Sequence, residues 1–147
     1  MEHGYPEPLS IQHDHPSLDL DERVVDRLVR HVVDTEGATL VHVSVVLTDH
    51  ATVHHLNREY LGHDYNTDVL SFSLRENAED EDIVEGEVYV DLDTAAERHV
   101  EFDTSFEQEA YRYVAHGVLH LLGYDDATEA GQETMRSREN RVLDAVL

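Results

Sequence analysis

The amino-acid sequence predicts an α+β fold in which a small mixed four-stranded sheet is packed with helices. The chain has 147 residues, 40% of them hydrophobic, so we expect a single domain spanning residues 1–147 around one buried core. Segments rich in β-branched residues alternate with segments whose apolar residues recur at helical spacing. Neither repeats nor an obvious linker interrupt this order, which favours helices layered on one sheet.

The N-terminal part is expected to hold a short strand and a long helix. All three prolines lie within residues 1–19, with an edge strand near residues 9–12. Residues 20–36 carry valines and leucines at helical spacing. This pattern predicts a helix with Asp19 as its N-cap and Gly37 as its stop.

A strand and a second helix follow. Residues 38–48 are dominated by β-branched side chains, which are typical of strands. Residues 49–62 are expected to be helical, capped by Asp49 and closed by Gly62.

Two further strands are predicted to form a hairpin. Residues 67–74 and 87–92 have strand composition, and residues 75–86 between them are acidic and are predicted to be a loop.

The rest of the chain is predicted to be helical. A short helix over residues 93–102 precedes a longer one over 105–123, which ends at Gly123. Residues 127–147 complete the chain as a helix, although Gly131 weakens that pattern locally.

The charge balance is strongly acidic. The chain has 33 acidic residues against ten basic ones, a formal charge of -23, and every basic residue is arginine. Repulsion on this scale opposes compactness in dilute salt, and molar salt screens it to about 3 Å. The composition therefore indicates adaptation to a salt-rich, halophilic cytoplasm, with a cationic partner as the alternative. RNA remains an admissible substrate, but not through bulk attraction at low salt.

Composition also excludes several classes of protein. Without cysteine there is no disulfide framework, thiolate ligand or cysteine nucleophile. No apolar run is long enough to span a membrane, and the N-terminus lacks a signal-peptide pattern. A cytoplasmic location is expected.

The stretch HGVLHLLGYDD, residues 116–126, is a candidate metal site. His116 and His120 lie one helical turn apart and project from one face. A helix end at Gly123 would let the chain turn back and present Asp125 or Asp126 to the same ion. Two imidazoles and one carboxylate suit zinc and leave a fourth position open for chemistry.

Two other interpretations of the histidines were weighed. His50, His54 and His55 provide a similar spacing, but without the helix-ending glycine and the following acid. A zinc peptidase would carry a glutamate base directly after the first histidine, where this chain has Gly117.

Three blocks of the sequence resemble the YbeY family of bacterial metal-dependent endoribonucleases that mature rRNA. The first is HGVLHLLGYDD itself; the others are LNREYLGHDYNTDVLSFSL, residues 56–74, and GEVYVDLDTAAE, residues 86–97. Their order and spacing agree with the family, so the resemblance covers most of the chain.

The resemblance implies one zinc ion per chain, held on and after a helix in the C-terminal half. His116 and His120 match the first two family ligands, and Asp126 stands where the family has a third histidine. Asp125 matches a family aspartate and is expected to be structural. Leu61 stands where the family has an arginine that assists phosphate chemistry.

Two further residues complete the candidate catalytic set with His116. Asp68 is expected to orient a metal-binding histidine or to cap a turn, and Arg75 to replace the missing arginine at position 61. Arg58 is an alternative to Arg75. Tyr60, among other aromatic residues, is a candidate platform for stacked bases.

The implied function is that of a single-strand-specific, metal-dependent endoribonuclease. It would act in rRNA maturation, including 3′-end processing of small-subunit rRNA, and in ribosome quality control. RNA and the ribosome are the expected partners, with no membrane and no DNA. The alternatives are a metallohydrolase of another substrate, such as a peptidase, and a non-catalytic zinc-binding factor of ribosome assembly.

Overall fold

A computed structural model of the chain describes residues 7–61, 68–74 and 82–147. It confirms the α+β class and the mixed four-stranded sheet. The sheet order is β1-β2-β4-β3, with β1, β2 and β4 parallel and β3 antiparallel to β4. The strands are β1 (Leu9–His13), β2 (Thr39–Thr48), β3 (Val69–Ser73) and β4 (Ile83–Asp91).

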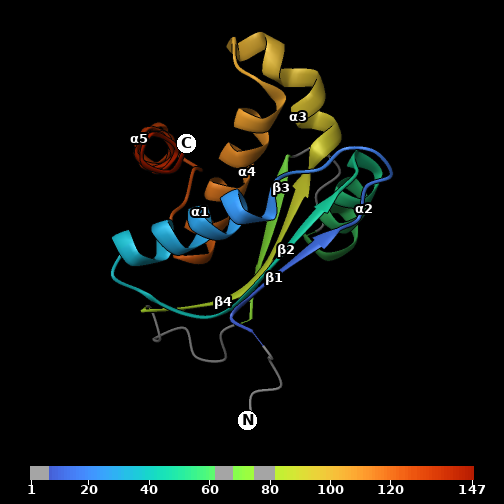
Figure 1. Cartoon of the computed structure of the whole chain (residues 1–147). Coiled ribbons are helices and arrows are strands. Elements are labelled where there is room, and N and C mark those ends of the chain that lie inside the picture. The colour runs from blue at the N-terminus through green and yellow to red at the C-terminus, as the bar shows by residue number, and fades with distance from the viewer. Residues whose placement is uncertain (1–6, 62–67, 75–81) are drawn as a thin grey trace.

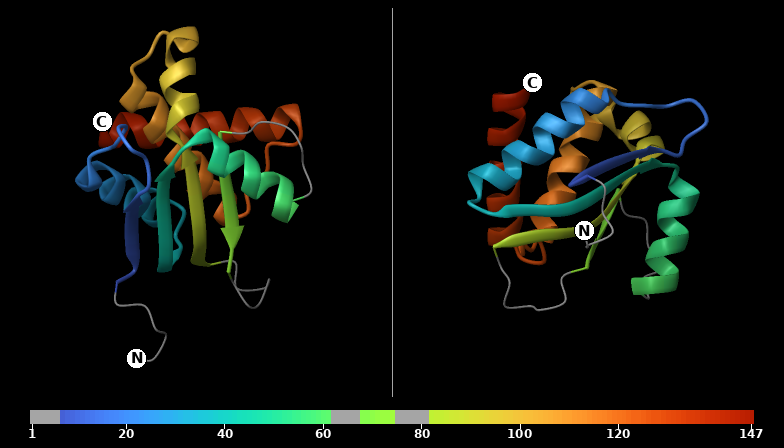
Figure 2. Two further views of the ribbon diagram at one scale, coloured as in Figure 1. Left: turned by 90° about the vertical axis from the view of Figure 1, so that its right-hand side faces the viewer. Right: turned by 60° about the horizontal axis from the view of Figure 1, so that its bottom comes forward.

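Helices cover both faces of the sheet unequally (Figures 1 and 2). On one face, α4 lies against β3 and β4, and α1 and α5 pack against α4. The other face carries α2, while α3 leads away from the end of β4. The helices are α1 (Glu22–Thr35), α2 (His50–Leu61), α3 (Leu92–Arg98) with the 3-10 turn His99–Phe102, α4 (Phe106–Leu121) and α5 (Glu129–Val146).

The core lies between the sheet and the helices α1, α4 and α5. The apolar stripe of α1 is almost entirely buried, and Leu28 within it has no exposed surface. The same buried cluster includes Val45 and Val88 of the sheet and Val114 of α4. Burial of one such side chain contributes about 1.5–3 kcal/mol, so this layer fixes how α4 sits on the sheet.

One helix end differs from the sequence prediction. The N-cap of α1 is Asp21, whose carboxylate accepts the Arg23 amide, and not Asp19. Asp19 instead binds the side chain of His13 and the Leu20 amide. Asp19 and Asp21 are only two residues apart, and either could cap a helix. Spacing alone therefore did not show which of them is the N-cap.

The other helix signals were read correctly where the structure describes them. The backbone of Gly37 has a φ of +70° after α1, and the Asp49 carboxylate accepts the Thr52 amide at the start of α2. Gly62, expected to close α2, lies outside the described residues.

The strand β4 begins at Ile83, which corrects the predicted start at residue 87. Its first residues were assigned to an acidic loop because of their charge, but the backbone pairs with β2 from Ile83 onward. Gly86 also pairs with Ser73 of β3, and a Cβ at Gly86 would lie 2.5 Å from the Phe72 carbonyl oxygen. Pairing on both edges outweighs the unfavourable strand propensity of glutamate and glycine. The predicted hairpin of β3 and β4 is present.

None of the helices in the described residues combines the length and hydrophobicity that crossing a bilayer requires.

Gly117 is the point at which α4 makes its closest approach to the sheet. A Cβ there would lie 2.4 Å from Val88 Cγ1 and 3.1 Å from the Ser71 hydroxyl oxygen. That hydroxyl donates to the Gly117 carbonyl at 2.8 Å. The position after His116 therefore faces the sheet, so it cannot carry a side chain directed at a metal ion.

We expect Gly117→Ala to destabilise the protein by about 1–3 kcal/mol, because the buried β-branched Val88 cannot move aside without overpacking the core. Chemical denaturation of Gly117→Ala, Val88→Ala and the double variant measures this. If the contact is the cause, the double variant loses less than the sum of the two single variants. Simple additivity would contradict the explanation.

Candidate metal centre

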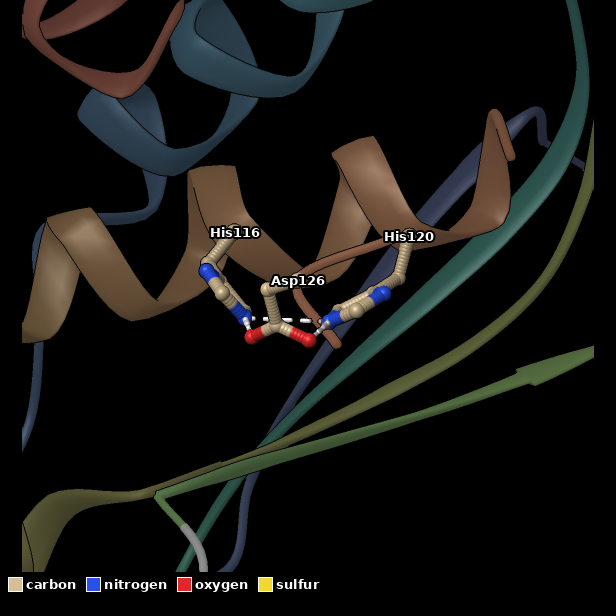
Figure 3. Close-up of side chains that lie close together, drawn as sticks. All are labelled: His116, His120 and Asp126. Carbon is tan, nitrogen blue, oxygen red and sulfur yellow. Dashed lines mark hydrogen bonds and ion pairs between the residues drawn. The ribbon is translucent and has the colours of Figure 1, made fainter. Parts of the chain in front are cut away.

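The helix α4 and the turn after it bring the three predicted ligands together. Ser105 caps α4 by accepting the Gln108 amide. At the other end Gly123 has a φ of +101°, a backbone conformation that favours glycine. The chain then turns back toward α5 and places Asp126 beside the helix face that carries His116 and His120 (Figure 3).

The ligand atoms converge closely. The two Nε2 atoms of His116 and His120 are 3.0 Å apart. The carboxylate of Asp126 lies alongside this pair, with one oxygen 3.3 Å from His116 Nε2 and the other 3.7 Å from His120 Nε2. Within residues 7–61, 68–74 and 82–147, His116, His120 and Asp126 form the one group of three histidine or acidic side chains whose ligand atoms all lie within 4.8 Å of one another.

The far sides of both imidazole rings have acceptors of their own. The Nδ1 atom of His116 lies 2.6 Å from a carboxylate oxygen of Glu139, and that of His120 lies 3.0 Å from the carbonyl oxygen of Tyr124. A proton on each Nδ1 satisfies these acceptors and leaves the Nε2 lone pairs facing one another. Two lone pairs at 3.0 Å repel, so this arrangement suits a positive charge shared by both nitrogens, either a proton or a metal ion. Metal-binding histidines are commonly held in this way, and the residues therefore fit a metal ion.

The charges of the metal-free site divide unequally between the two histidines. Burial lowers the pKa of His116, but Glu139, Asp68 and Asp126 outweigh it and raise that pKa overall. Burial and the neighbouring charge of His116 lower the pKa of His120. Without metal, a proton is therefore held more strongly by His116 than by His120, and a metal ion bound at Nε2 must displace any proton there.

A family model described as "Endoribonuclease YbeY" matches residues 10–147. The chain belongs to the YbeY family. It is 64% identical to the "Endoribonuclease YbeY" of Salinibacter ruber (strain DSM 13855 / M31), over 97% of this chain and 94% of that protein. The protein of the same name from Chlorobium phaeovibrioides is 41% identical over 84% of this chain and 81% of its own length.

A solved structure shares the YbeY-like fold of this chain. The solution structure of a Thermotoga maritima protein matches with a TM-score of 0.61 and 31% identity, over 92% of this chain and 88% of that one. Membership in an endoribonuclease family implies RNA as the substrate.

In this YbeY chain the ligand turn is fixed by its own backbone. Asp125 accepts the Ala127 amide, which confirms the structural role expected for it. A Cβ on Gly131 of α5 would lie 2.3 Å from the Asp125 carbonyl oxygen, so only glycine allows this approach. The glycine that weakened the sequence prediction of α5 therefore helps to place Asp126.

Glu139 is the site residue that sequence reasoning missed. It is 5% exposed, lies on α5, and receives Arg112 at 2.9 Å through its other oxygen. The orienting role expected of Asp68 is filled by Glu139 for His116 and by the Tyr124 carbonyl for His120. No local pattern marks Glu139, because its partner is 23 residues away in sequence.

Of the other two predicted catalytic residues of this YbeY chain, the structure places one, Asp68, beside the metal centre. Asp68 is half-buried and lines a cavity of about 240 Å³ together with His116 and Asp126. Burial raises its pKa, and the charge of His116 partly opposes this. Arg75 lies outside the described residues. Leu61 is the last residue of α2.

We expect Glu139→Gln to weaken zinc binding by about tenfold, because the variant loses the charge that holds and polarises His116. A competition titration of the metal-free protein against a chromogenic chelator measures the dissociation constant. Glu133→Gln removes the same charge from an exposed position on the same helix and should bind zinc as the wild type does. Equal affinities for the two variants would show that Glu139 has no part in metal binding.

Proposed function

We propose that this chain is a zinc-dependent endoribonuclease that cuts single-stranded RNA. Its biological context would be rRNA maturation in the cytoplasm, including 3′-end processing of small-subunit rRNA, and ribosome quality control. One observation supports the metal dependence above all others. In a chain of an endoribonuclease family, two Nε2 atoms and a carboxylate face one point while both Nδ1 atoms are engaged behind them.

The bound zinc would polarise a phosphoryl oxygen and lower the pKa of a coordinated water. The chain itself performs the remaining tasks. Glu139 and the Tyr124 carbonyl hold the two imidazoles in one tautomer. Asp68, whose pKa is raised by burial, is proposed to exchange a proton with an oxygen of the reacting phosphate. Arg75 is proposed to contact the phosphate from outside the described residues.

The shape of the site favours an unpaired strand. Beside the cavity that holds His116 lies a second one of about 770 Å³, and both are lined by Asp68 and Arg98. Recesses of this size admit single nucleotides that have left a stack, whereas a duplex keeps its bases paired. A peptidase is disfavoured, because Gly117 faces the sheet and leaves no position for the usual glutamate base.

The decisive experiment offers zinc-loaded protein, in molar KCl, a single-stranded RNA, the same RNA as a duplex, the corresponding DNA strand and casein. We expect cleavage of the single-stranded RNA alone. Cleavage of casein would establish a peptidase. Failure to cut any of them would favour a non-catalytic factor of ribosome assembly, with zinc in a structural role.

We expect Leu61→Arg to raise the rate of RNA cleavage by about tenfold or more, because a guanidinium stabilises the charge that develops on phosphate and leucine cannot. Initial rates at saturating RNA test this. Leu61→Gln, which is polar but uncharged, serves as the control and should change the rate little. An unchanged rate in Leu61→Arg would mean that this position does not face the reacting phosphate.

A further inference from the structure

The cavity at the metal centre is unusually rich in arginine for so acidic a chain. The protein has ten arginines and no lysine. Three of the ten, Arg98, Arg112 and Arg136, line this one cavity and come from three different helices. The cavity is also lined by four carboxylates, those of Asp68, Glu109, Asp126 and Glu139. Any anion bound there must therefore be held by specific contacts and not by bulk charge.

Two of these arginines have donors to spare. Both terminal nitrogens of Arg112 already bind the protein, one to Glu139 at 2.9 Å and the other to Asn140 at 2.8 Å. Arg136 has neither an ion pair nor a hydrogen bond within the part of the chain that the structure describes.

The side chain of Arg98 is held in place while its terminal N–H donors remain available. Its Nε lies 3.6 Å from a Glu101 oxygen, and its guanidinium lies over the ring of Phe102 at 5.2 Å. Among the described residues its two terminal nitrogens have no acceptor. The residue also lines the neighbouring cavity of about 770 Å³, so it stands where the two cavities meet.

A buried hydroxyl with no partner lines the same cavity. Tyr113 lies on α4 one turn before His116 and is only 4% exposed. Its hydroxyl oxygen has no hydrogen-bond partner among the described residues. Burial, the charges of Asp68 and Glu109, and the nearby Glu109 side chain as an acceptor raise the pKa of Tyr113. The Glu109 contact nevertheless falls short of hydrogen-bond geometry. The phenol therefore stays protonated, and its donor has no well-formed hydrogen bond, which is costly in a buried position.

We propose that Arg98, Arg136 and Tyr113 form a phosphate subsite that binds a backbone phosphate of the RNA strand next to the one at the metal centre. This inference rests on the proposed function. Guanidinium groups match phosphate oxygens with paired donors, and a buried hydroxyl adds a third donor. Because Arg98 borders both cavities, a strand leaving His116 passes it on the way into the larger cavity. The three residues position the strand and take no part in the chemical step.

The test measures RNA binding by the metal-free protein, so that no strand is cut. The probe is a fluorescent single-stranded RNA of ten nucleotides, followed by anisotropy across a series of KCl concentrations. We expect Arg98→Gln and Arg136→Gln each to lose about tenfold in affinity. In each, the slope of log affinity against log salt should become more positive by about 0.7, the value for one lost phosphate contact on a single strand. Arg23→Gln, whose parent side chain is 86% exposed and pairs with Asp21, should keep the wild-type slope.

Tyr113→Phe separates binding from folding. Removal of an unpaired buried hydroxyl should leave the melting temperature of the free protein unchanged or raise it, while RNA affinity falls about tenfold. A lower melting temperature with unchanged affinity would show a structural role and would remove Tyr113 from the subsite. In zinc-loaded protein the arginine variants should raise KM and leave kcat within about twofold.

The outcomes distinguish this subsite from the proposed function. If the wild type cuts RNA but the arginine variants keep its affinity and salt slope, the subsite is wrong and the function stands. If zinc-loaded wild type cuts no RNA, the function fails, and the binding series still decides the subsite. A wild type that binds no RNA overturns the subsite as well.

Discussion

His120→Ala is expected to lose both the metal ion and RNA cleavage. Removal of one of three ligands leaves His116 and Asp126, and two ligands do not make a stable zinc site. Metal content measured by elemental analysis should fall from one ion per chain to near zero, and the cleavage rate should fall at least about 100-fold. His116→Ala should behave in the same way.

A matched control comes from the second histidine pair. His50 and His54 are also four residues apart on a helix, and their rings stack at 5.9 Å. Because His54 is not one of the three proposed ligands, His54→Ala should keep the full metal content and activity. Equal metal content in His120→Ala and the wild type would contradict the site described above.

Thermal stability provides a second measure of the same loss. A ligand at 100 times its dissociation constant stabilises the folded state by about 2.7 kcal/mol. A chelator should therefore lower the melting temperature of the wild type and leave that of His120→Ala unchanged. An equal response of both proteins would show that the chelator acts elsewhere.

Salt is expected to have the other large effect, and its sign is unusual for a protein that acts on RNA. Across residues 7–61, 68–74 and 82–147, five arginines form ion pairs with carboxylates. The chain has 33 acidic residues, so most of its negative charge has no arginine partner. At 0.01 M salt such charges repel over about 30 Å, and at 1 M over only about 3 Å.

We expect the melting temperature to rise on the order of 10 °C between 0.05 M and 2 M KCl, which is about 3–5 kcal/mol for a domain of this size. RNA affinity should also rise over the lower part of that range, because the strand is an anion too. Thermal melts and binding titrations measure both. A variant with Asp34→Asn, Glu133→Gln and Asp144→Asn removes three exposed negative charges. Its melting temperature should be higher than that of the wild type at 0.05 M KCl and should rise less with added salt. A melting temperature that falls steadily with KCl would refute the salt-adapted interpretation.

Local patterns predicted most of the fold. The helical spacing of valines and leucines that predicts α1 can be recognised within that segment alone. The same holds for the β-branched composition that predicts β2. The predicted start of β4 was wrong because Glu85 and Gly86 both pair with β2, and Gly86 pairs with β3 as well, which no single segment reveals.

The site residues, too, could be predicted only where a single segment of the sequence brings them together. His116, His120 and Asp126 could be found because a single helix and its turn bring them together. Glu139 and Tyr113 could not, because their roles depend on how α5 packs against α4 and on what surrounds a buried hydroxyl. The roles of Asp68 and Arg75 in catalysis stay predictions.

The placement of Glu139 makes the C-terminal helix part of the metal centre. The turn that carries Asp126 joins α4 to α5, and Glu139 reaches from α5 to His116. Zinc would thus add a further tie to α5, which already packs against α1 and α4. Amide hydrogens of α5 should exchange with solvent more slowly once zinc is bound, and a truncation within α5 should release the ion. Proteolytic trimming of this end would then switch the centre off without touching a single ligand.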